Sequence, residues 1–517
     1  MPKIDNDIKL DFDDVLIVPQ RSTLTSRSEI QLERTFHFYH SPRTWTGIPI
    51  MCANMSFCSF EIAKSLAKHK MIACLHKYHA VEQLYNYFKE HPENIDYTFV
   101  SIGYKKSDLN HLLELKDKLG KQPNICIDVP NGHMDVFVKY CHKVRENFPE
   151  SIIIAGNVTN TSSTQELLIY GGVDIVKVGI GGGCFVEGTK VYTKYGYVNI
   201  EDITTRDMVL THDLKYRRVI GTSTRLENDA IISINDIRCT PNHLFRAVHK
   251  NYISLGNYSR YITWIPAADL NKDYMLLRVI DNKIELQEIY SYAEEETQPV
   301  IVYDIEVDID HSFIVNDGIV VHNSACTTRM LTACGVPQLS ACLENSYAAH
   351  GLQNGPKKLG LIVSDGGHKN VGDVCKALCA GADFVMLGGY FAGSESCDGE
   401  WEYEYYCGKG SSHPFWQPLN PGYETEKRKT KFTYYGMSTH YAQEKYEDNI
   451  KSYRASEGTK IAVKYKGTTD KVIQELFGGI RSCCSYIGAV STKDMNKCGS
   501  FCRVNKIHNN TNPILGV

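Results

Sequence analysis

Apolar stretches alternate with amphipathic stretches over most of the chain, and this alternation restricts the fold more than any other feature. Continuous apolar runs that end in glycine, asparagine or aspartate are typical of strands buried on both faces. Eight such runs occur, at residues 48–55, 71–77, 97–103, 124–129, 151–158, 173–180, 359–367 and 382–389. Helical stretches lie between them, at residues 60–68, 81–90, 109–119, 134–148, 166–170, 342–350 and 371–378. Eight strands with seven intervening helices predict an α/β fold of the (β/α)8 (TIM) barrel type, whereas fewer strands would suit a doubly wound sheet equally well.

Polar residues and glycines gather where the expected strands end. In a barrel of this type, the chemistry takes place at the carboxyl ends of the strands. The residues found there are Asn54, Lys77, Asp128, Asn157, 179–183, 365–367 and 388–389. Backbone amides without a side chain can approach a phosphate closely, so the glycine pairs after the seventh and eighth strands predict a phosphate site. One glycine pair alone would more often be a tight turn.

The composition excludes several classes of partner. A formal net charge of −4 gives no electrostatic reason to expect nucleic-acid binding. No apolar stretch approaches the roughly 20 residues of a membrane helix, and the acidic start of the chain has no signal-peptide core. We therefore expect a cytoplasmic protein with neither a membrane nor a nucleic-acid partner. The 18 cysteines include no C-x-x-C spacing, and we expect reduced thiols rather than disulfides or zinc ligands.

The glycine-rich run that ends the sixth expected strand is interrupted. Residues 176–183 read V-K-V-G-I-G-G-G, and the polar sequence S-A-C-T-T-R follows only at 324–329. The exposed amides of such a loop should be followed at once by polar or nucleophilic side chains. Residues 184–323 are therefore interpreted as an insert, and the host barrel consists of residues 1–183 and 324–517.

Joined across the insert, the loop reads G-I-G-G-G-S-A-C-T-T-R, which resembles the catalytic loop of GMP reductases and IMP dehydrogenases. The resemblance to GMP reductases covers almost the whole host. It includes residues 5–12, 21–28, 126–132, 364–367, 385–389, 435–438, 453–458 and 478–482. IMP dehydrogenase is the alternative, but that enzyme usually carries a regulatory domain pair early in the barrel. The interval from Lys77 to Tyr97 leaves no room for one.

The resemblance implies NADPH-dependent reductive deamination of GMP to IMP and ammonia. Cys326 would attack the purine C2 as a thiolate and form a covalent thioimidate. Thr328 and Glu457 would relay protons to the departing ammonia. The implied GMP-binding residues are Asp365, Gly366, Gly367, Gly388, Gly389, Gly436, Met437, Ser438, Arg454, Ala455, Ser456, Glu457 and Gly458.

The resemblance also implies a cofactor site, a monovalent cation and a homotetramer. The cation, expected to be potassium, would lie among Gly181, Gly183, Cys326 and Arg329. The implied NADPH-binding residues are Ser26, Arg27, Lys77, Asp128, Val129, Pro130, Ile180, Gly181, Met437, Tyr453, Arg454, Ser482, Cys483, Cys484 and Ser485.

The chain departs from the family pattern at several positions. Ser56 follows Asn54-Met55 where the family has aspartate, Gly182 replaces a proline, and Pro130 replaces an alanine. Residues 394–433 form a longer, aromatic segment, which we expect to enlarge a mobile loop over the site. These departures concern cofactor preference and rate more than the class of reaction.

The insert has a sequence character of its own. Short β-like runs predict a compact all-β unit, and they lie at 190–192, 231–234, 274–279, 284–289 and 300–307. The insert resembles a mini-intein, a self-splicing element without an endonuclease domain, in four blocks. These are residues 184–191, 239–245, 302–307 with 311–313, and 320–323 followed by Ser324.

The intein resemblance implies that the insert removes itself. Cys184 would take the acyl group of Gly183 onto its sulfur, and Ser324 would attack the resulting thioester. Asn323 would then cyclise, which releases the insert and joins Gly183 to Ser324. The residues expected to polarise the scissile bond, assist cleavage or position Cys184 are Thr240, His243, Asp304, His311 and His322.

Two alternatives remain open for the insert. A Hedgehog-type autoprocessing domain shares the first cysteine and the T-x-x-H pair, but it lacks the terminal asparagine and following nucleophile present here. An insert that folds without splicing would leave a nucleotide-binding barrel that carries a permanent interaction module in its loop.

Overall fold

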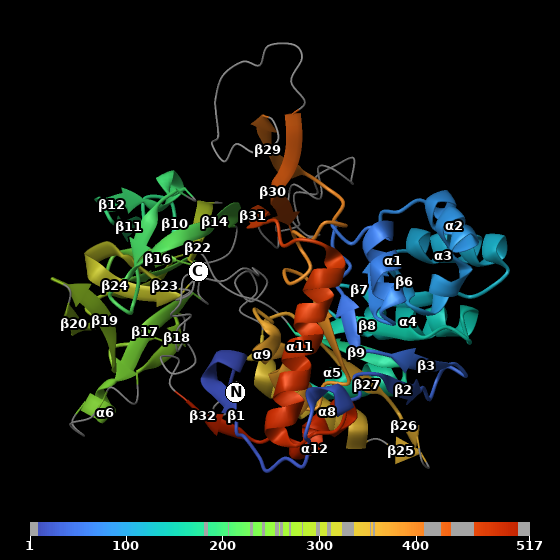
Figure 1. The fold of residues 1–517 in the computed structure, drawn as a ribbon. Coiled ribbons are helices and arrows are strands. Elements are labelled where there is room, and N and C mark those ends of the chain that lie inside the picture. Colours follow the sequence, from blue (N-terminus) through green and yellow to red (C-terminus); the bar gives the residue numbers. More distant parts are fainter. Residues whose placement is uncertain are drawn as a thin grey trace.

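The computed structural model describes most of the host and most of the insert. The described residues are 9–179, 185–204, 206–227, 231–239, 243–253, 258, 262–267, 270–281, 283–295, 300–307, 312–322, 335–351, 353–354, 357–407, 425–435 and 460–504. Figure 1 shows the strands of the insert as one group and the barrel with its helices as another. No helix in the described ranges is long and apolar enough to cross a membrane.

Eight parallel strands form a closed barrel, as the sequence predicts. Around the barrel the order is β27, β28, β4, β5, β6, β7, β8 and β9, so the last strand in the chain pairs with the first. Every expected run contains one of these strands. Their bounds are β4 (Ile50–Cys52), β5 (Ile72–Leu75), β6 (Thr98–Ile102), β7 (Asn124–Asp128), β8 (Ile153–Val158), β9 (Ile175–Val178), β27 (Leu361–Asp365) and β28 (Phe384–Leu387).

Helices follow the strands and cover the barrel (Figure 1). The seven expected helices are all present, although α5 begins at Thr161, five positions earlier than predicted, because the side chain of Asn160 caps its first turn. An eighth, α11, was missed by the sequence analysis. The helices are α1 (Phe60–Lys68), α2 (Val81–Glu90), α3 (Lys106–Leu119), α4 (Asp135–Asn147), α5 (Thr161–Ile169), α8 (Gln338–Gly351), α9 (Val371–Cys379) and α11 (Thr469–Ile487).

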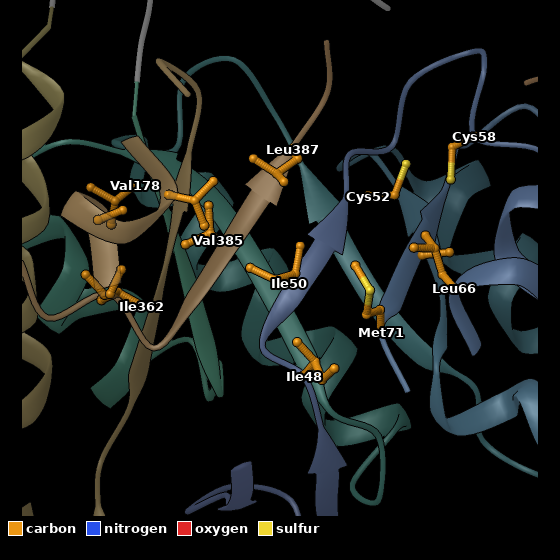
Figure 2. Close-up of a cluster of buried hydrophobic side chains, with 14 of the residues drawn as sticks. Ile48, Ile50, Cys52, Cys58, Leu66, Met71, Val178, Ile362, Val385 and Leu387 are labelled. Atoms are coloured by element: carbon orange, nitrogen blue, oxygen red, sulfur yellow. The ribbon is translucent and has the colours of Figure 1, made fainter. Parts of the chain in front are cut away.

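Alternate residues of each barrel strand enter two different apolar clusters. Ile50 and Cys52 pack in the cluster that also contains the buried residues of the helices, whereas Met51 belongs to a second cluster. Figure 2 shows side chains of the first cluster, with Ile50, Val385 and Leu387 contributed by neighbouring strands.

The amino-terminal end of the barrel is covered by a hairpin of β2 (Arg34–His37) and β3 (Thr44–Gly47). The ring of Phe36 stacks at 4.4 Å on Phe384, the first residue of β28, and Trp45 packs on the same ring. The second apolar cluster includes these aromatic residues. The hairpin leaves the carboxyl ends of the strands as the end where ligands can reach the barrel.

The described residues between 185 and 322 lie mostly in β-strands and include one short α-helix, α6 (Lys250–Ile253). Among the described residues, an apolar cluster packs side chains between Phe185 and Val321. The strands belong to one 15-stranded sheet. They are β10 (Phe185–Val186), β11 (Lys190–Thr193), β12 (Gly196–Asn199), β13 (Met208–Leu210), β14 (Tyr216–Glu227), β15 (Ile231–Ile234), β16 (Ile237–Cys239), β17 (Leu244–His249), β18 (Thr263–Pro266), β19 (Tyr274–Ile280), β20 (Lys283–Glu288), β21 (Tyr292–Glu295), β22 (Val300–Val307), β23 (Ser312–Val315) and β24 (Ile319–His322).

The segment expected to be a long loop, residues 394–433, is in turns at 394–400 but forms strands at 401–407 and 425–433. Strands β29 (Trp401–Cys407), β30 (Thr425–Tyr435) and β31 (Lys460–Lys464) pair antiparallel. Trp401 packs on Phe432 at 4.9 Å, and Phe432 reaches Phe57 of the barrel at 6.5 Å. Trp401, one of the aromatic residues of this segment, thus packs with Phe432 and Phe57 in a small aromatic cluster, whereas Tyr403 is exposed. A further pair, β1 (Val15–Ile17) and β32 (Phe501–Arg503), joins the two ends of the chain.

Candidate active site at the carboxyl ends of the strands

An ion triad of a buried lysine and two partly exposed carboxylates occupies the carboxyl ends of β7, β9 and β27. Lys177 of β9 is 1% exposed, and its Nζ forms a close ion pair with Asp128 at the end of β7. The same Nζ lies 3.2 Å from Oδ2 of Asp365 at the end of β27. One ammonium group thus joins an expected cofactor-binding carboxylate to an expected substrate-binding carboxylate.

The triad fixes the charge of its members. Burial would raise the pKa of Asp128, but Lys177, with a hydrogen bond from Asn54 and the charge of Lys77, lowers it below its ordinary value. Burial would likewise lower the pKa of Lys177, but Asp128 and Asp365 raise it well above its ordinary value. The lysine and Asp128 are therefore both ionised near neutral pH.

The end of β9 is held against β8 and β27. Asn157 Nδ2 donates to Oδ2 of Asp365 at 2.9 Å and to the carbonyl oxygen of Gly179 at 3.0 Å. Gly179 has φ of 144°, and a Cβ there would lie 2.0 Å from the carbonyl oxygen of Asp365. Only glycine allows the backbone to pass this point, immediately before the interrupted loop.

The chain returns from the insert close to where it left. Gln338, the first residue of α8, donates from Nε2 to the carbonyl oxygen of Val178 at 2.7 Å and lies 3.1 Å from Ser364 Oγ. Ser364 Oγ also lies 3.0 Å from His368 Nε2. Burial lowers the pKa of His368 to about 4, which keeps this imidazole neutral at physiological pH. The sequence analysis singled out neither Gln338 nor His368.

Two glycine loops lie side by side after β27 and β28, which are paired strands. Gly366 and Gly367 have φ of 94° and 81°, in the left-handed region that favours glycine. A Cβ added at Gly366 or at Gly389 would meet no atom of a described residue within 4 Å, so both loops border space that these residues leave open. Exposed backbone amides next to open space are suited to an anion such as phosphate, as the sequence predicts for these loops.

The described part of the expected cofactor set forms two separate groups. The first group, at the carboxyl ends of the strands, consists of Lys77, Asp128, Val129 and Pro130. In the second, Ser26 caps a 3-10 turn at Arg27–Glu29 that packs against α11, and the last turns of this helix carry residues 482–485.

The two groups lie at opposite ends of the barrel. Helix α11 begins beside the loop after β28, where Thr469 Oγ1 bonds Ser394 Oγ at 3.3 Å. The segment that follows α11 lies near the amino-terminal end of the barrel. There, Thr492 Oγ1 donates a hydrogen bond to the carbonyl oxygen of Leu32 at 3.0 Å. A helix of 19 residues is about 28 Å long. One chain therefore does not bring the whole expected set together.

Many expected site residues lie outside the described residues, so the structure neither assembles nor separates them. The described ranges contain no group of three or more His, Cys, Asp or Glu side chains that could hold a metal ion. The expected residues outside those ranges are Ile180, Gly181, Gly183, Cys184, Thr240, His311, Asn323, Ser324, Cys326, Thr328, Arg329, Gly436, Met437, Ser438, Tyr453, Arg454, Ala455, Ser456, Glu457 and Gly458.

Within the insert, strand register aligns the neighbours of three expected splicing residues. Phe185, which follows Cys184, pairs with Cys239, which precedes Thr240. Phe185 also pairs with Tyr303, which precedes Asp304. Three motifs that are far apart in the sequence therefore begin or end in one row of the sheet.

His243 and the strand that ends at His322, β24, lie near Phe185 as well. His243 is 1% exposed, and its ring lies 3.8 Å from the ring of Phe185. Phe185 also contacts Phe313 at 5.8 Å, and Phe313 pairs with Val321. His322, the last described residue of the insert, pairs with Ser312, the neighbour of His311. Phe185 of the first described strand is thus linked through Phe313 to Val321 of the last.

Comparison with known proteins agrees with the barrel. The sequence profile of the IMP dehydrogenase / GMP reductase domain matches residues 9–212 and 318–510, and the interval between these matches falls inside the insert. The chain is 30% identical over 510 residues to GMP reductase 1 of Homo sapiens, in an alignment spanning 98% of this chain and 99% of that protein. It is 31% identical over 510 residues to a GMP reductase of Shewanella pealeana, spanning 98% of each. A GMP reductase of Onchocerca volvulus is 31% identical over 508 residues, with 98% of this chain and 93% of that protein covered. The chain belongs to the IMP dehydrogenase/GMP reductase family.

Proposed function

We propose that this chain is the precursor of a GMP reductase, which reduces GMP to IMP and ammonia with NADPH. The observation that carries the proposal is the full-length similarity to proteins named GMP reductase, in a chain whose barrel contains the Asp128–Lys177–Asp365 triad. The triad places the Asp365 carboxyl group beside two open glycine loops. This combination suits the hydroxyl groups and the phosphate of a nucleotide.

The proposed chemistry depends on residues of the interrupted loop. Cys326 attacks the purine C2 as a thiolate, and the C2–nitrogen bond breaks to release ammonia. Thr328 and Glu457 transfer the protons that this leaving group needs. When bound, NADPH would supply a hydride to C2, and the bond between C2 and the Cys326 sulfur would break to release the product and free the thiol. Lys77 and Asp128 are suited to hold that cofactor because they join one charged cluster at the carboxyl ends of the strands.

We also propose that residues 184–323 are a mini-intein that joins residues 1–183 to residues 324–517. The cross-strand row at Phe185 supports this assignment, because it places the flanks of Cys184, Thr240 and Asp304 together. Three further assignments are part of the proposal. Gly181, Gly183, Cys326 and Arg329 frame potassium, the active form is a homotetramer, and a second copy supplies the cofactor group at the other end of the barrel.

The first experiment is intact-mass spectrometry of freshly expressed protein, followed by an assay of NADPH oxidation with GMP. Two products, with the larger joined at Gly183–Ser324, and GMP-dependent oxidation by that product are the expected result. A matched precursor with Cys184→Ala and Asn323→Ala should stay full length and inactive. Full activity of this double variant would contradict the requirement for a continuous loop.

The family profile also covers IMP dehydrogenases, so oxidation of IMP with NAD is the second candidate reaction. Spliced protein incubated with IMP and NAD would then produce reduced cofactor, whereas GMP with NADPH would give no reaction. A stable full-length chain that binds GMP without turnover would instead indicate a binding barrel with a permanent module.

A further inference from the structure

Lys466 lies between two parts of the host that the proposed function requires. It follows β31 by two positions and precedes α11, an arrangement visible in Figure 1. Its Nζ donates to the carbonyl oxygens of Gly389 at 2.6 Å and of Tyr390 at 3.0 Å. Its backbone amide donates to the carbonyl oxygen of Gly393 at 2.9 Å. One residue therefore holds the loop after β28 at three carbonyl groups.

These bonds determine which backbone groups of the loop remain available. The carbonyl oxygen of Gly388 accepts from the amides of Phe391 at 3.1 Å and Ala392 at 3.3 Å. Those of Gly389 and Tyr390 are directed to Lys466. The amides of Gly389 and Tyr390 donate no hydrogen bond to the residues that the structure describes. With its carbonyl oxygens bound, the loop offers amide hydrogens rather than acceptor oxygens to an anion.

The charge of Lys466 acts in the same direction. Desolvation lowers the pKa of Lys466 to about 8, although much of its side chain is accessible. The nearby Cys397 thiol raises the pKa and so opposes this shift. The ammonium group therefore stays protonated at neutral pH, one peptide unit from the open space at Gly389. A dianionic phosphate bound there would interact favourably with this charge.

Lys466 also connects the loop to the sheet from which the remaining expected GMP-binding residues emerge. Tyr435 pairs with Lys460, so the segment between them starts and ends at one point of the β30–β31 hairpin. The amide of Tyr465 donates to the carbonyl oxygen of Thr430 at 2.9 Å, which fixes the chain next to Lys466 on the same sheet. Lys466 and Tyr465 therefore connect the loop after β28 to the sheet of β30 and β31.

We propose that Lys466 is a positioning residue for the phosphate group of the nucleotide substrate. It orients the loop after β28 through the carbonyl groups of Gly389 and Tyr390, and it adds a positive charge behind that loop. The inference rests on the proposed function for the identity of the nucleotide, GMP. The requirement for a phosphate group follows from the loop itself and does not depend on turnover.

The test compares the dissociation constants of GMP and guanosine, which differ only in the phosphate group, by calorimetry on protein of matched splicing state. We expect Lys466→Met to weaken GMP binding by about 10-fold or more, as for loss of a charge-assisted interaction, and to leave guanosine binding unchanged. Lys466→Arg should restore most of the affinity for GMP. Lys464→Met, at an exposed lysine two positions earlier, is the matched control and should bind as wild type.

Several results would overturn the inference. Equal weakening of GMP and guanosine binding would indicate a general structural role, and no change in either would exclude a role for Lys466. If Lys466→Met does not fold, Lys466→Gln provides the same comparison, because its amide can still donate to a carbonyl oxygen without the charge. Wild-type protein that prefers GMP to guanosine but lacks reductase activity would contradict the proposed function and leave this inference testable. Wild-type protein without that preference would contradict the inference itself.

Discussion

Gln338 donates a hydrogen bond to the carbonyl oxygen of Val178 at 2.7 Å, although 160 positions separate the two residues. Val178 ends β9 just before the insert, and Gln338 opens α8 just after the interrupted loop. The host thus closes upon itself where the insert leaves and returns. A segment between two such neighbouring points can be lengthened or shortened without moving the barrel.

Replacing Gln338 with leucine should destabilise the host. Gln338 is 2% exposed, and leucine would leave the carbonyl oxygen of Val178 without this donor. An unsatisfied buried acceptor costs about 1–3 kcal/mol in the free energy of unfolding. Urea denaturation of chains in the same splicing state measures the change. Gln474→Leu, at an exposed position of α11, is the matched control and should change stability little. Equal stability of the two variants would show that the bond is unimportant.

Replacing Lys177 with methionine should be more damaging. The substitution leaves Asp128 and Asp365 next to each other without their shared cation. Removing one partner of a buried ion pair typically costs about 3–5 kcal/mol in the free energy of unfolding. Lys139→Met, at an exposed position of α4, should be nearly neutral. A Lys177→Met chain that unfolds at the wild-type urea concentration would contradict the role of the triad.

The triad should also make the difference between wild type and Lys177→Met depend on pH. The pKa of Asp128 is lowered in the folded chain, so its contribution is present above the ordinary aspartate value and is lost as pH falls. The pKa of Lys177 is raised, so its contribution is present below the ordinary lysine value and is lost as pH rises. Ordinary values are about 3.9 and about 10.4, so the stability difference should be flat between about pH 5 and 9 and shrink below pH 4. A difference that grows on acidification would have the wrong sign.

Replacing His243 with glutamine should slow splicing without unfolding the insert. The ring packs on Phe185, the neighbour of Cys184, and is the only described side chain of the T-x-x-H pair. Loss of a general acid or base lowers a rate by about 100-fold or more, so full-length chain should accumulate. Intact mass against time after expression provides the measurement. His249→Gln, on the same strand β17, is the control, and equal splicing of the two variants would remove His243 from the mechanism.

The barrel could be predicted because its strands are buried on both faces. Runs such as 124–129 are apolar throughout, with Asp128 marking the carboxyl end, and this pattern predicts both the strand and the position of its functional residue. Lys177 was overlooked, although it and Asp174 are the two charged residues in the expected strand at 173–180. A lysine in a fully buried strand requires carboxylates nearby, and that requirement pointed to Asp128 and Asp365.

Other features depend on tertiary packing and are less accessible from the sequence. Helix α11 has a clear cap at Thr468 and a left-handed glycine at Gly488, and it was missed because the alternation was followed only to the eighth strand. The β29–β30 pair was taken for a loop, because its alternating aromatic and charged residues suit solvent unless a partner such as Phe57 covers one face. Lys466 gave no signal, since its role depends on where the loop after β28 lies.

The described part of the insert core consists of insert residues, and this has a consequence for the order of events during synthesis. Ile50 of the first barrel strand pairs with Val385 of the last, so the barrel cannot close before the ribosome has passed that residue. The last described strand of the insert, β24, ends at His322, well before Val385 in the chain. Since domains generally fold as units while the chain emerges, the insert can reach its final shape while the host is still open. The time between synthesis of the insert and synthesis of the last barrel strand, together with the rate of splicing, then decides the outcome. The barrel first closes around either a continuous loop or an interrupted one.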